Sequence, residues 1–122
     1  MSENAQAAIE AIDQPDPEEI RAHAEDAARL LKALANSARL QVLCSLVDGE
    51  LSVGQINENV ALSQSALSQH LAILRREGLV STRRCGQTIY YALAGMAVQR
   101  VLEVLHDIYC DEGHSVGLAK AC

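Results

Sequence analysis

The four cysteines have the widest range of chemistry in this chain, and they are Cys44, Cys85, Cys110 and Cys122. A cysteine thiolate can attack another sulfur atom, bind a soft metal or close a disulfide. None of the four stands in the short Cys-x-x-Cys spacing of a small zinc module. The sequence therefore offers thiols for redox or inducer chemistry, and no cofactor is expected.

The N-terminus and the hydropathy pattern predict a reducing compartment for these thiols. The first residues are acidic where a secretory signal would be basic, and no apolar run approaches the ~20 residues that cross a membrane. We therefore expect a cytoplasmic protein with no membrane partner. Cysteines in the cytoplasm are reduced thiols at rest and not structural disulfides.

The distribution of charge indicates a nucleic-acid partner, although the formal net charge is −6. Residues 29–93 hold seven bases against four acids, whereas residues 1–28 hold eight acids and one base. A basic segment of this kind suits the phosphates of a nucleic acid. A module that binds only other proteins would explain the acidic ends of the chain but not its basic middle.

The spacing of apolar residues predicts a mainly α-helical domain with one small β-hairpin. Helices are expected at about 17–34, 37–48, 53–59, 64–77 and 95–111, and strands at 79–84 and 88–93 around a turn at 85–87. Helix starts are indicated by Asp16 before Pro17, by Asn36, by Ser52 with Gln55, and by Ser63. The order α-α-α-α-β-β-α is that of a winged helix-turn-helix. We expect this DNA-binding and dimerisation domain at 16–112, between a flexible acidic tail at 1–15 and a flexible tail at 113–122.

The predicted helix at 64–77 is the candidate reading helix of this motif. Leu67, Leu71 and Leu74 predict one buried side, which leaves polar residues exposed on the first turns. Glutamine can bond adenine bidentately, serine allows close approach, and arginines, here including Arg76, bind phosphates. The residues assigned to double-stranded operator DNA are Gln64, Ser65, Ser68, Gln69, His70, Arg75, Arg83, Arg84 and Gln87. For the Ser and Gln run alone, the alternative is a solvated helix face.

Three segments carry a resemblance to a known family: LKALANSARL at 31–40, LSQSALSQHL at 62–71 and GQTIYY at 86–91. They resemble the ArsR/SmtB family of winged-helix repressors, and the resemblance covers roughly residues 25–110. It implies a homodimer whose interface is built by the first and last helices. It also implies a repressor that leaves its operator when an inducer arrives.

The metal and arsenic sensors of that family differ in where their ligands lie. One arrangement is a Cys-x-Cys cluster at the start of the short third helix, where this chain reads ELSVGQ at 50–55 and has no thiol. Another arrangement uses the last helix, on which His106, Cys110 and His114 recur at i, i+4 and i+8. Gly113 is expected to end that helix before His114, and the family's Asp-x-His opening is absent. Zinc at these three residues is therefore kept as an alternative inducer.

The pair Cys44 and Cys110 resembles the sulfide- and persulfide-sensing branch of the family, the SqrR, BigR and HlyU type. The resemblance implies that a disulfide or polysulfide bridge joins the two thiols and that DNA is then released. Reactive sulfur species are thus the expected inducer. The alternative is that each cysteine is a small buried hydrophobe. His106, one turn before Cys110, is interpreted as a surface residue.

Two further thiols leave arsenite open as an inducer, because arsenite prefers three sulfur ligands. Cys85 is expected at the wing tip beside Arg83 and Arg84, an electropositive setting that activates a thiol. Cys122 is the C-terminal residue. An enzyme is not expected, because neither a nucleophile, base and orienting-residue cluster nor a glycine-rich phosphate loop is legible.

Overall fold

The computed structural model describes residues 16–109 of the chain. In that range five helices and three short strands follow one another as α2 (Pro17–Leu34), α3 (Ser37–Ser45), β1 (Leu51–Ser52), α4 (Val53–Asn59), α5 (Gln64–Arg76), β2 (Val80–Cys85), β3 (Thr88–Leu93) and α6 (Met96–Tyr109). This is a winged helix-turn-helix, as the sequence predicts. The predicted tails, together with Cys110, His114 and Cys122, lie outside the described residues.

Side-chain caps start three of the helices where the sequence predicts them. The Asn36 side chain accepts a hydrogen bond from the Arg39 amide at 3.0 Å, and the Ser63 hydroxyl accepts one from Ala66 at 3.1 Å. Ser52 and Gln55 form the full capping box of α4. Asp16 occupies the N-cap position of α2 without a side-chain hydrogen bond, so there the start rests on Pro17 at the first helical position.

The second helix ends earlier than the sequence predicts. α3 stops at Ser45 and not near Asp48, because the next amides turn back three residues: Leu46 to the Leu43 carbonyl at 3.0 Å and Val47 to Cys44 at 3.2 Å. Such tightening satisfies carbonyls that a continuing helix would use. Val47 therefore lies beyond the end of α3 and is 38% exposed.

The wing is one strand wider than expected. The sheet has the order β1-β3-β2, and the two residues of β1 pair with Tyr91 and Tyr90 of β3. The wing turn is also shorter than expected, because Cys85 belongs to β2 and pairs with Thr88. Gly86 has φ of 65°, and a glycine in this conformation at the first of two loop residues suits a tight hairpin.

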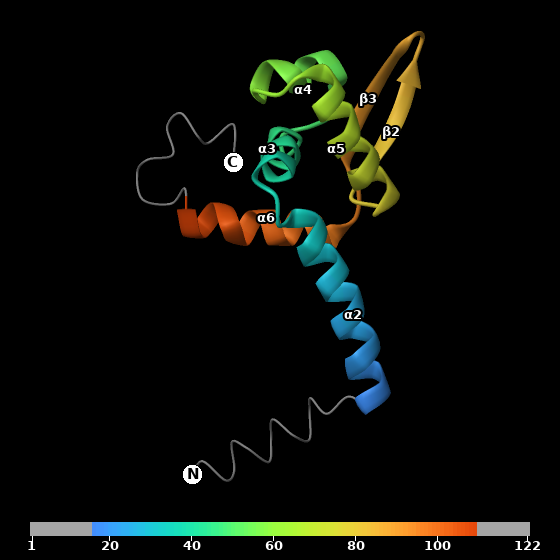
Figure 1. Cartoon of the computed structure of the whole chain (residues 1–122), viewed down its shortest axis with the longest axis vertical. Helices are drawn as coiled ribbons and strands as arrows, with labels where there is room; N and C mark the ends of the chain where they lie inside the picture. Colours follow the sequence, from blue (N-terminus) through green and yellow to red (C-terminus); the bar gives the residue numbers. More distant parts are fainter. Residues whose placement is uncertain (1–15, 110–122) are drawn as a thin grey trace.

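The core of the described region is aliphatic and joins every helix to the base of the wing. Its largest fully buried side chains are Leu43, Ile56, Leu67, Leu71, Leu74, Val42 and Val98. Figure 1 shows the hairpin of β2 and β3 projecting beside α5, with α4 at the same end of the molecule and α2 extending away at the opposite end. No helix in the described part of the chain is long and apolar enough to span a membrane.

Candidate DNA interface and thiol site

The first turns of α5 present the polar residues that the sequence assigns to base reading. Gln64, Ser65, Ser68 and Gln69 are all exposed, whereas Leu67, Leu71 and Leu74 are buried on the opposite side. The helix is anchored by its apolar side, so its polar N-terminal turns are free to approach the edges of base pairs.

His70 differs from the other candidate reading residues. It is half-buried, and its Nδ1 atom is buried with no hydrogen-bond partner among the described residues. That nitrogen faces away from solvent and is not available to a base edge in this conformation. The helical spacing did not predict the burial of this nitrogen, because His70 lies at the margin between the polar face and the buried side that holds Leu71.

The two wing arginines have different surroundings. Arg83 donates hydrogen bonds from Nε to both carboxylate oxygens of Glu50 at 3.1 Å, and its guanidinium lies 4.9 Å from the centre of the Tyr90 ring. The hydrogen bond from Arg83 is the main reason why the pKa of Glu50 is lowered. Arg84 is exposed, and no ion pair involves it among residues 16–109. Gln87 is exposed in the wing turn.

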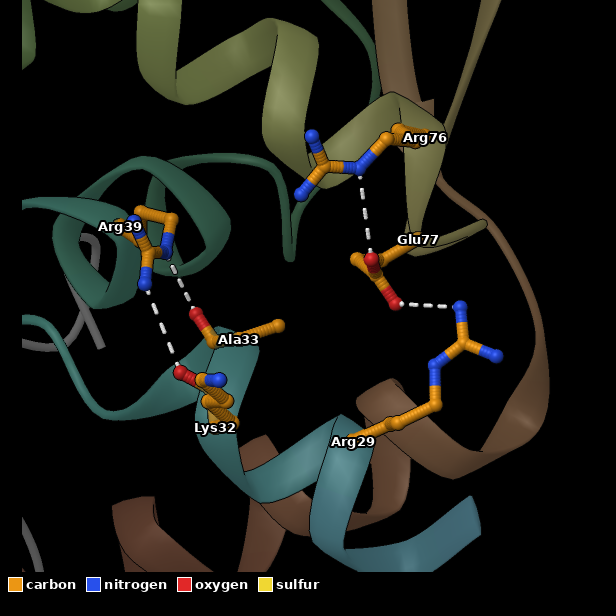
Figure 2. Close-up of polar contacts among 6 residues, drawn as sticks. All are labelled: Arg29, Lys32, Ala33, Arg39, Arg76 and Glu77. Carbon is orange, nitrogen blue, oxygen red and sulfur yellow. Dashed lines mark hydrogen bonds and ion pairs between the residues drawn. The ribbon is translucent and has the colours of Figure 1, made fainter. Parts of the chain in front are cut away.

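The C-terminal end of α5 carries a cluster that the sequence analysis missed. Glu77 accepts hydrogen bonds from Arg29 at 3.0 Å and from Arg76 at 3.4 Å, as Figure 2 shows. Arg39 donates to the carbonyl oxygens of Ala33 at 2.6 Å and of Lys32 at 3.4 Å, at the end of α2. In the sequence these residues belong to the basic segment at 29–93 that is expected to meet a nucleic acid. The fold instead gathers four basic residues around a hollow of about 280 Å³, namely Arg29, Lys32, Arg39 and Arg76. Arg75 is exposed beside this cluster.

The thiols of Cys44 and Cys85 lie in different environments. Cys44 on α3 is half-buried and packs against the core, and burial raises the pKa of its thiol. Cys85 at the end of β2 is exposed. Cys110 follows Tyr109 directly in the sequence, outside the described residues. The structure therefore describes one member of the predicted Cys44–Cys110 pair.

His106 is less exposed than the sequence interpretation supposed. It is half-buried, and its Nδ1 atom is buried without a hydrogen-bond partner among the described residues. The reason is its place on the inner side of α6, where with Leu102 it lines a hollow of about 260 Å³ facing Val47 and Asp48. Within residues 16–109, no group of three or more His, Cys, Asp and Glu side chains could hold a metal ion. The alternative zinc site also needs Cys110 and His114, which lie beyond that range.

Comparison with known proteins assigns the family. Residues 36–82 match the bacterial regulatory protein arsR family. The transcriptional activator HlyU of Vibrio cholerae is 53% identical over 93 residues, which cover 76% of this chain and 86% of the relative. The chain belongs to the ArsR family. It is a transcriptional regulator of that family, and the relatives point to the HlyU and BigR branch.

Further ArsR-family relatives agree with this assignment. The nodulation protein NolR of Rhizobium meliloti is 52% identical over 103 residues, covering 84% of each chain. The biofilm growth-associated repressor of Xylella fastidiosa is 37% identical over 95 residues, covering 78% of this chain and 83% of the relative. HlyU is named as a transcriptional activator and the Xylella fastidiosa relative as a repressor, so both are regulators.

Solved ArsR-family structures have the same fold. Reduced HlyU from Vibrio cholerae superposes with a TM-score of 0.73 at 53% identity, covering 76% of this chain and 98% of that one. The winged helix-turn-helix DNA-binding domain of Mb0332 from Mycobacterium bovis, a homodimer, gives a TM-score of 0.66 at 33% identity, covering 84% of this chain and 96% of the other.

Proposed function

We propose that this ArsR-family regulator is a homodimeric repressor that releases its operator when Cys44 and Cys110 are joined through reactive sulfur. The observation that carries the proposal is the placement of Cys44. It is half-buried on α3, one turn before the residues that face α6 across a hollow. Cys110 follows four residues after His106 in the sequence, and His106 lines the same hollow. A sulfur bridge here would fasten the end of α3 to the end of α6.

The homodimer follows from apolar residues that the single chain leaves uncovered on α2 and α6. The large exposed apolar side chains of these two helices are Ile20, Leu31, Met96, Val104, Ile108 and Tyr109. A soluble chain rarely leaves so many large apolar groups on two helices without a partner surface. A second copy of the chain is the proposed partner, since Mb0332 is described as a homodimer.

The raised pKa of the Cys44 thiol suggests the order of the sulfur chemistry. A protonated thiol is a weak nucleophile, so Cys110 is assigned the first attack and Cys44 the second. The Cys110 thiolate attacks the outer sulfur of a persulfide R–S–SH, releases the thiol R–SH and becomes Cys–S–SH. Cys44 then attacks the inner sulfur of that group, which forms a disulfide and expels H₂S. If both cysteines carry a persulfide, one attacks the other, expels H₂S and leaves a trisulfide. A metal cofactor is not part of this proposal.

The bridge acts on DNA through the dimer geometry. The two reading helices must match one turn of DNA, about 34 Å, so a small change in α6 at the interface misplaces one half-site. Lowering occupancy from 99% to 1% requires a coupling of about 5.5 kcal/mol, above the usual 1–3 kcal/mol of one pair of sites. Strong release is therefore expected only when both subunits are bridged.

Four single variants test the proposal. Operator binding by fluorescence anisotropy and intact mass spectrometry are measured before and after treatment with inorganic polysulfide, peroxide, zinc or arsenite. Cys44→Ser and Cys110→Ser should bind DNA and stay bound after polysulfide is added. The control variants Cys85→Ser and Cys122→Ser should release DNA in polysulfide as the parent does. Release of Cys44→Ser or Cys110→Ser at the parent's polysulfide concentration would overturn the proposal. Release by zinc or arsenite alone would favour the metal alternatives.

A further inference from the structure

We infer that Glu77 is a positioning residue that ties the reading helix to α2 and thereby sets the spacing of the two reading helices on DNA. The inference concerns the DNA-binding geometry; it rests on the homodimer of the proposed function and does not depend on the thiol chemistry. It rests on the cluster of Arg29, Glu77 and Arg76 at the C-terminal end of α5 (Figure 2).

Glu77 occupies the point where α5 ends. It is the C-cap residue, and its own amide bonds the Ile73 carbonyl at 2.9 Å. Its side chain is only 18% exposed and reaches Arg29, which lies 48 positions earlier on α2. Replacing the carboxylate leaves the backbone cap in place, so a Glu77→Gln variant removes the charge of the link without ending the helix elsewhere.

The arginines of the cluster already bind acceptors within the protein, which argues against a site for a bound anion. Arg29 and Arg76 share Glu77, and Arg39 binds the last carbonyls of α2. Of the four basic side chains around the hollow, that of Lys32 alone makes no hydrogen bond or ion pair among the described residues. A ligand phosphate would have to displace Glu77. The cluster is therefore better suited to joining elements than to holding a ligand.

The ion pair of Arg29 and Glu77 holds one end of α5, so a small tilt at that end moves the other end of the helix by several ångströms. α5 has 13 residues and is about 20 Å long at 1.5 Å per residue. Its candidate reading residues lie at the first turns, and Glu77 lies at the other end. A tilt of about 10° around the Glu77 end moves the first turn by roughly 3 Å, enough to misplace a base contact. α2 carries exposed Ile20 and Leu31, the face proposed for the dimer, so a link from α2 to α5 fixes the reading helix relative to the dimer.

The test uses an operator duplex that the parent protein selects from random-sequence DNA. Glu77→Gln and Arg29→Gln should each weaken operator binding about threefold to fivefold, the range of a partly exposed ion pair. Both should also lose preference between duplexes whose half-sites are one base pair closer or farther apart. The doubly reversed variant Arg29→Glu with Glu77→Arg should regain affinity and spacing preference. Arg21→Gln is the matched control, because Arg21 pairs with Glu18 inside α2 and should change nothing.

A merely local role for Glu77 predicts different results. In that case Arg29→Gln leaves operator affinity unchanged, and the spacing preference of both variants equals the parent's. A local role also predicts that the doubly reversed variant binds the operator no better than the single variants. Either result would overturn the inference, and neither bears on the response of Cys44 and Cys110 to polysulfide.

Discussion

The guanidinium of Arg83 is held against the carboxylate of Glu50, with its Nε atom 3.1 Å from each carboxylate oxygen. Glu50 immediately precedes β1, so the pair ties the middle of the wing to the segment that leads into α4. Arg83 is therefore already paired with a carboxylate before any DNA arrives, while Arg84 is exposed and makes no ion pair among the described residues.

The wing arginines should contribute unequally to DNA affinity. Arg84→Ala is expected to weaken binding to all sequences alike and to flatten the slope of log affinity against log salt by about one unit. Arg83→Ala should flatten it less, because a phosphate must compete with Glu50 for this guanidinium. Glu50→Gln should steepen the slope. Binding measured by anisotropy at four salt concentrations gives the salt slope of each variant. Equal slopes for Arg83→Ala and Arg84→Ala would contradict the prediction.

The exposed first turns of α5 should determine sequence preference. Gln64→Ala and Ser68→Ala are each expected to lower discrimination between operator and mismatched DNA by about 1–3 kcal/mol, the value of a close base contact. Competition binding with single-mismatch duplexes measures this. Ala72→Ser, also exposed on α5 but nearer its C-terminal end, is the control. Unchanged preference in both variants would remove these residues from the reading surface.

Cys44 and Cys85 should differ in the rate of alkylation. Burial raises the pKa of the Cys44 thiol, so less thiolate is present at neutral pH, and access is restricted as well. Iodoacetamide at pH 7 is therefore expected to label Cys85 before Cys44, with Cys44 catching up as the pH rises. Peptide mass spectrometry follows both sites, and labelling in urea is the control in which the two rates converge. Faster labelling of Cys44 in the folded protein would contradict the burial argument.

The link through Glu77 should contribute to stability in a pH-dependent way. The hydrogen bond from Arg29 lowers the pKa of Glu77, so its contribution is fully present above the ordinary glutamate pKa of about 4.3. The contribution is lost as the pH falls through the lowered value in the folded state. Urea denaturation of parent and Glu77→Gln should therefore give a difference in midpoint that is constant near neutral pH and shrinks in acid. A difference that persists unchanged in acid would show that charge is not its cause.

Charge placed on the exposed apolar residues of α2 and α6 should break the dimer. Leu31 and Ile108 are each 57% exposed, and burying that exposed part against a partner copy is worth about 1–2 kcal/mol per side chain. Leu31→Glu and Ile108→Glu are expected to shift the protein toward monomer in light scattering and to lose operator binding. Gln99→Glu, exposed on α6, is the control for added charge. A stable dimer in both variants would place the interface elsewhere.

Local rules determined much of this fold from the sequence. Asn36, Ser52 and Ser63 start helices because a short polar side chain caps the free amides two or three residues ahead. The leucines of α5 define its buried side because their spacing matches the helical repeat. Gly86 marks the wing turn because it adopts positive φ without strain. Each of these signals lies within a few residues of the feature that it predicts.

Only the tertiary structure decided which charged residues meet. Arg29 and Glu77 are 48 positions apart, and Glu50 and Arg83 are 33 apart. Nothing in the local pattern distinguishes an arginine that will bind a carboxylate from one that stays free for a phosphate. The two-residue strand β1 was missed for a related reason, since it exists through its pairing with Tyr90 and Tyr91. Such contacts arise when packing of the core brings distant segments together, and a linear pattern does not encode that proximity.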